Sequence, residues 1–91
     1  MPNQRQQLSE EDLNNAANSV YAKTIMRAGQ KGFGSMASNH EILGIIQQET
    51  SEYEDAVHKR HSDEEKIEEL KDIAVACIFG IASIKTGGID W

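Results

Sequence analysis

The stretch IIQQETSEYEDAV, residues 45–57, places a glutamate where a helix would otherwise be apolar. The apolar residues around it recur at spacings of three and four, which predicts an amphipathic helix. At about 3.6 residues per turn, Glu49 falls on the apolar stripe and Glu52 lies at its edge. Both carboxylates are therefore expected to face a neighbouring helix. The stripe consists of Ile42, Ile45, Ile46, Tyr53, Ala56 and Val57.

Capping signals and glycines divide the rest of the chain. Ser9 opens S-E-E-D, which resembles a capping box, and predicts a first helix that ends at Gly29. Residues 29–39 are rich in glycine and serine and are expected to form a loop, after which Asn39 caps the second helix. Ser62 opens a third helix that stops at Gly87. Residues 1–8 are expected to be a flexible tail.

Length and composition indicate one helical domain over residues 1–91. From Ile73 onward the third helix is apolar around its whole circumference, so it needs cover on all sides. Three helices cannot cover the whole apolar surface of the third helix, and a second copy of the chain is the simplest source of the missing cover. We therefore expect an all-α fold, an antiparallel bundle of three main helices completed by homo-oligomerisation as a dimer or tetramer.

Charge and the apolar runs limit the partners. The net charge of −6 argues against a sequence-independent grip on nucleic acid. The chain has no apolar signal core, and its longest apolar run is too short to cross a bilayer. A single cysteine, Cys77, rules out an intrachain disulfide and fits a reducing compartment. These features predict a cytoplasmic protein that binds neither nucleic acid nor membrane.

Two further acids, Glu69 and Asp72, lie one turn apart on the third helix, where its solvated face becomes apolar. The short turn near His61 makes the second and third helices antiparallel neighbours, so Glu49 and Glu52 reach the same height as this pair. Carboxylates that converge in a partly dry groove take up protons or recruit a cation. Oxygen ligands select Mg²⁺, then Mn²⁺ or Ca²⁺. The alternative is that both pairs are ordinary solvated surface.

The constellation E49-T-S-E52, sixteen residues, then E69-L-K-D72 resembles the E-x-x-E, spacer, E-x-x-D motif of the MazG-like all-α nucleoside triphosphate pyrophosphohydrolases. Residues 38–90 are similar to the core of that family. The resemblance implies that Glu49, Glu52, Glu69 and Asp72 bind Mg²⁺, which Mn²⁺ can replace. It also implies cleavage of a (deoxy)nucleoside triphosphate to the monophosphate and pyrophosphate, as housecleaning of the nucleotide pool.

The roles of further residues follow from this resemblance. Glu49 or Glu52 is the expected base that accepts the proton of the attacking water. The basic residues that the family places around the acids are missing one turn before Glu49 and Glu69. Lys31, Lys66 and Lys85 are candidates to hold the phosphates of the substrate in their place. Phe33 is a candidate to stack on the nucleobase, and His40 is a candidate to contact the base or a phosphate.

Two other functions stay open. The missing basic residues suggest a catalytically silent module that binds nucleotide or metal. The second is a purely structural oligomerisation bundle, in which the acids are surface.

Overall fold

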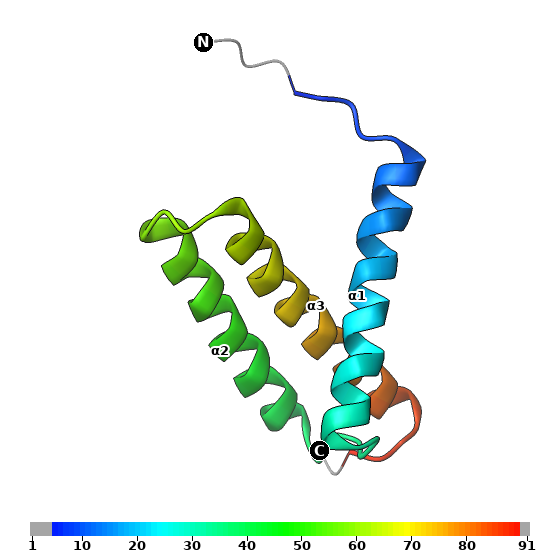
Figure 1. Ribbon diagram of the computed structural model, residues 1–91. Helices are drawn as coiled ribbons and strands as arrows, with labels where there is room; N and C mark the ends of the chain where they lie inside the picture. Colours follow the sequence, from blue (N-terminus) through cyan, green and yellow to red (C-terminus); the bar gives the residue numbers. More distant parts are fainter. Residues whose placement is uncertain (1–4, 90–91) are drawn as a thin grey trace.

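The computed structural model describes residues 5–89, which form three α-helices and no strand. Helix α1 spans Glu10–Lys31, α2 spans Asn39–His58 and α3 spans Asp63–Lys85 (Figure 1). The predicted all-α fold with three main helices is confirmed. Of the predicted tail, residues 5–8 are exposed and lack regular structure, and residues 1–4 lie outside the described residues.

Serine caps begin all three helices. Ser9 and Ser62 form the predicted capping boxes: each hydroxyl accepts a hydrogen bond from the backbone N–H three residues on, and Asp12 and Glu65 accept from the serine N–H in return. These hydrogen bonds lower the pKa of both carboxyl groups. The caps satisfy amides that the first turn of a helix leaves without partners.

The loop between α1 and α2 is shorter than predicted. Helix α1 continues through Gly29 to Lys31, and Gly32 ends it with a φ of 93°, a conformation that favours glycine. The second helix is capped by Ser38, whose hydroxyl accepts from the N–H of Glu41, and not by Asn39. A glycine inside a helix costs too little to end it when the following residues still favour helix.

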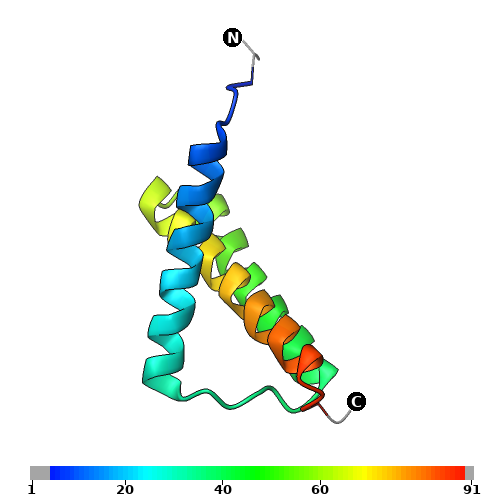
Figure 2. The same ribbon diagram turned by 90° about the vertical axis from the view of Figure 1, so that its right-hand side faces the viewer.

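Helix α3 is the centre of the fold because it packs against both other helices. Helix α2 lies beside α3 along much of its length, whereas α1 crosses α3 and diverges from it toward residue 31 (Figures 1 and 2). The loop then returns to the end of α3, where the Met36 N–H donates to the Ser83 hydroxyl at 2.9 Å. Helix α1 therefore contacts α3 through Lys23 and Arg27, and only its C-terminal end lies apart from the α2–α3 pair.

The core is thin. The buried apolar residues of the described chain are all small, namely Ala28, Ala56, Val75 and Ala76. Larger ones stay open to solvent, including Ile81 at 58% and Ile84 at 53% exposure on α3. The radius of gyration is 15.3 Å, against about 12 Å for a compact domain of this length. Within residues 5–89, no helix is both long and apolar enough to span a membrane.

Candidate metal centre and adjoining cleft

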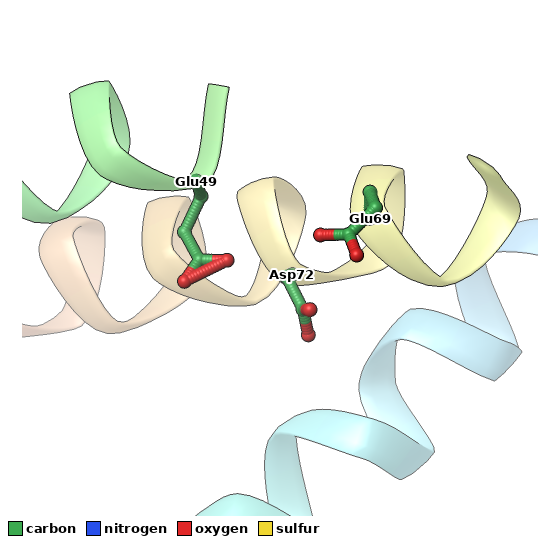
Figure 3. A group of neighbouring side chains, drawn as sticks. All are labelled: Glu49, Glu69 and Asp72. Atoms are coloured by element: carbon green, nitrogen blue, oxygen red, sulfur yellow. The ribbon is translucent and has the colours of Figure 1, made fainter. Parts of the chain in front are cut away.

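Three of the four predicted carboxylates come together between α2 and α3. Glu49 projects from α2, while Glu69 and Asp72 project from α3 (Figure 3). One oxygen from each lies within 4.8 Å of the others. In Figure 3 the carboxylates of Glu49 and Glu69 point toward each other, and that of Asp72 points toward α1. The inward position of Glu49, predicted from its place in the apolar stripe, is confirmed.

Glu49 and Glu69 are poorly compensated. Glu49 Oε2 and Glu69 Oε1 are buried and have no hydrogen-bond partner within the described chain. Burial raises the pKa of Glu49, and the negative charges of Glu52, Asp72 and Glu69 raise it further. Burial and the neighbouring acids Glu52 and Asp72 raise the pKa of Glu69 in the same way. Both groups therefore resist ionisation, as carboxyls do when they are desolvated beside like charges.

Asp72 is compensated by two cations from α1. Lys23 Nζ lies 2.8 Å from Asp72 Oδ1, and Arg27 Nη2 lies 3.0 Å from the same oxygen. Lys23 also pairs with Glu68 at 2.8 Å. Burial alone would lower the pKa of Lys23, but its hydrogen bonds to Asp72 and Glu68 outweigh that effect and raise it. The crossing of α1 over α3 thus sets two positive charges against one carboxylate of the group.

Glu52, the fourth predicted ligand, is exposed and lies outside the close group of three. Its charge nevertheless contributes to the raised pKa of Glu49 and of Glu69. Four carboxylates and the two cations Lys23 and Arg27 leave a formal charge of −2 when all are ionised. One divalent cation would neutralise it.

A cleft of about 430 Å³ opens beside the carboxylates, where α1 diverges from α3. Glu49 and Arg27 line it next to the acidic group, and Ile45, Val75 and Phe79 supply apolar walls. The remaining lining residues are Lys31, Gly32, Gly34, Ser35, Met36, Glu41, Gln48 and Ala76. The cleft combines apolar walls with the cations Arg27 and Lys31 at one side, which suits a ligand that carries an apolar part and an anionic part.

The predicted substrate contacts are scattered. Lys31 lines the cleft, but Phe33, His40, Lys66 and Lys85 are absent from its lining. Phe33 is 79% exposed in the loop, and His40 is exposed in the first turn of α2. Lys66 pairs with Asp63 at 3.2 Å near the start of α3, and Lys85 is the exposed last residue of that helix. The structure therefore brings one of these five residues to the cleft.

Sequence reasoning missed Lys23 and Arg27. They stand one turn apart on α1, on the side that carries the buried residues Thr24 and Ala28. A usable signal was present, because Lys23 and Arg27 are spaced i, i+4 and flank the two small residues. Larger apolar residues elsewhere on α1 give a stronger periodicity signal than these small ones, although Tyr21, for example, is 62% exposed.

Comparison with known proteins finds no relative of this chain. No family model matches this chain, and neither the curated proteins nor the solved structures contain a match.

Proposed function

We propose that this protein is a Mg²⁺-dependent nucleoside triphosphate pyrophosphohydrolase of the MazG-like type, which forms a nucleoside monophosphate and pyrophosphate. The observation that carries the proposal is the meeting of Glu49, Glu69 and Asp72 within 4.8 Å, with two buried oxygens left unpaired. The E-x-x-E and E-x-x-D pairs on which the resemblance rests supply these residues. The adjoining cleft supports it, since it offers apolar walls and a cationic side next to the acids.

The residues fit a hard divalent cation. All three donors are carboxylate oxygens, the ligand type that Mg²⁺ and Mn²⁺ prefer. Ligands of one octahedral Mg²⁺ lie about 3.0 Å apart at adjacent positions and about 4.2 Å apart at opposite ones, so the three oxygens, now within 4.8 Å of one another, would have to move closer to share an ion. The unpaired Glu49 Oε2 and Glu69 Oε1 lack the hydrogen bonds that usually accompany burial. A bound cation would give both oxygens the partner that they lack.

The proposed chemistry assigns roles to residues of the chain. When bound, the ion neutralises charge on the phosphate oxygens. Glu69 and Asp72 hold it, and Glu49 lies between the acidic group and the cleft. Because Glu49 lines the cleft beside the acidic group, we assign a Glu49 oxygen that the ion leaves free as the base that accepts a proton from the attacking water. Exposed Glu52 is the alternative base and a ligand at the solvent side.

The same proposal includes an antiparallel bundle that is completed by a second copy. The exposed apolar residues of α3 and the absence of a large buried side chain in the described chain support it. A domain of this size hides too little apolar surface alone, and self-association is a common remedy. Nucleotide-pool housecleaning in the cytoplasm remains the proposed setting.

A structural oligomerisation bundle is the second candidate. It is favoured by the ion pairs of Asp72 with Lys23 and Arg27, which satisfy this carboxylate without a metal. In that case the acidic group only joins α1 to α3, and Glu49 destabilises the interface between α2 and α3 without binding a ligand.

Release of pyrophosphate from a panel of canonical and modified (deoxy)nucleoside triphosphates tests the proposal. We expect turnover with Mg²⁺ or Mn²⁺ that chelation abolishes. Glu69→Gln should lose at least tenfold in kcat/KM, whereas Glu54→Gln, on the exposed side of α2, should match the wild type. Folded protein that turns over none of these nucleotides with either metal would leave a silent binding module or the structural bundle.

A further inference from the structure

The three carboxylates of the acidic group are unequally compensated. Asp72 has two cations at hydrogen-bond distance, whereas Glu49 and Glu69 each keep a buried oxygen without a partner in the described chain. Lys23 and Arg27 contact the same atom, Asp72 Oδ1. Without a metal, α1 therefore already supplies the positive charge that a divalent ion would bring.

A divalent ion and these two cations are in conflict. An ion that binds either oxygen of Asp72 withdraws negative charge from Oδ1, and its own charge repels the ammonium and the guanidinium. Lys23 is 12% exposed and keeps a second partner, Glu68, at 2.8 Å. Arg27 is 31% exposed, and Asp72 is the carboxylate with which it pairs. Arg27 is thus the cation that can leave at the lower cost.

Arg27 also has a place to go, because it lines the cleft together with Lys31. We propose that Arg27 is an exchangeable counter-ion: it neutralises Asp72 in the metal-free protein, a divalent cation displaces it, and the freed guanidinium then binds an anion in the cleft. This inference rests on the proposed metal site. It orders binding, with the divalent ion first and the anion second.

Titration calorimetry with Mn²⁺ alone tests the exchange. Arg27→Gln removes the +1 charge that Mn²⁺ otherwise has to displace from Asp72 Oδ1, 3.0 Å away, so it should bind Mn²⁺ roughly tenfold more tightly than the wild type, even with water-like screening. Arg27→Lys retains the charge and should stay within about twofold of the wild type. Lys59→Gln removes an exposed charge in the turn after α2 and should not change the affinity.

The outcomes separate the two proposals. Equal or weaker binding by Arg27→Gln, beside measurable binding by the wild type, overturns the exchange and leaves the metal site standing. Binding by Arg27→Gln but not by the wild type supports the exchange in its strongest form. Absence of binding by both overturns the exchange and the metal site together.

Nitrogen-15 NMR of arginine side chains follows Arg27 in the unaltered protein, which has three arginines. We expect Mg²⁺ to shift the Arg27 Nε–H signal and to speed its exchange with water. Inorganic phosphate should then shift the same signal with Mg²⁺ present and leave it unchanged without Mg²⁺. A phosphate shift of equal size in the absence of Mg²⁺, or no response to Mg²⁺ by a protein that binds it, contradicts the exchange.

Discussion

Replacing Glu49 with glutamine is expected to stabilise the metal-free protein and to remove its response to Mg²⁺. Glu49 lies within 4.8 Å of Glu69 and Asp72. Two like charges at that distance cost about 0.9 kcal/mol in a water-like medium. The repulsion on Glu49 comes first from Glu52 and then from Asp72 and Glu69, and Arg27 offsets part of it. Because Glu49 is only partly buried, we expect a net gain of about 1 kcal/mol.

The assay is thermal and urea unfolding at pH 7, first with a chelator and then with Mg²⁺. Without metal, Glu49→Gln should raise Tm by roughly 5 °C, the shift that about 1 kcal/mol produces in a domain of this size. At ten times its Kd, Mg²⁺ should stabilise the wild type by about 1.4 kcal/mol and the variant by much less. The order of stability should therefore reverse.

The matched control is Glu54→Gln, which removes an exposed carboxylate from the same helix and should stay within about 0.5 kcal/mol of the wild type. The reasoning is refuted by a Glu49→Gln variant that is no more stable than the wild type with chelator present. It is equally refuted if Mg²⁺ stabilises both proteins to the same extent.

Three further predictions concern the fold and its pH dependence. Gly44→Ala should raise the free energy of unfolding by about 0.5–1 kcal/mol, whereas Gly80→Ala should lower it in urea unfolding. Space is free around Gly44, but a Cβ at Gly80 would lie 2.9 Å from Ile42 Cγ2. Light scattering should give a mass above that of one chain, and Ile81→Lys should shift it toward the monomer, because Ile81 is 58% exposed on α3. Metal-free stability should fall as pH drops below about 4, where the two capping-box carboxyls of lowered pKa take up protons. Metal-free stability should also fall as pH rises above 4.5, the ordinary pKa of glutamate. Glu49 and Glu69, whose pKa is raised, still hold protons in the folded state that the unfolded chain has lost. Mg²⁺ should reverse this second loss of stability.

Local signals were sufficient to predict the helices. The serine caps with an acid three residues later placed the starts of α1 and α3 correctly, because a capping box depends on neighbouring residues alone. The predicted end of α1 was wrong by two residues, since Gly29 is a weaker stop than Gly32, whose φ of 93° ends the helix. Such boundaries depend on small differences between neighbouring positions.

The acidic group was only partly predictable. Helical periodicity placed Glu49 inward, and the short turn brought it level with Glu69 and Asp72. The pairing of Asp72 with Lys23 and Arg27 depends on how α1 crosses α3, at a separation of 45 residues or more along the chain. No local pattern encodes that crossing angle. It depends on which residues of α1 are buried, and these are the small residues Thr24 and Ala28, which periodicity alone ranks below the larger apolar ones.

The most direct test of the metal centre is an anomalous difference map from a crystal of the protein soaked in Mn²⁺. We predict a peak among the carboxylates of Glu49, Glu69 and Asp72, with Arg27 turned away from Asp72. A map without a peak there, in which Lys23 and Arg27 still hold Asp72 and the two glutamates turn outward to water, would contradict the metal site and the hydrolase function built on it.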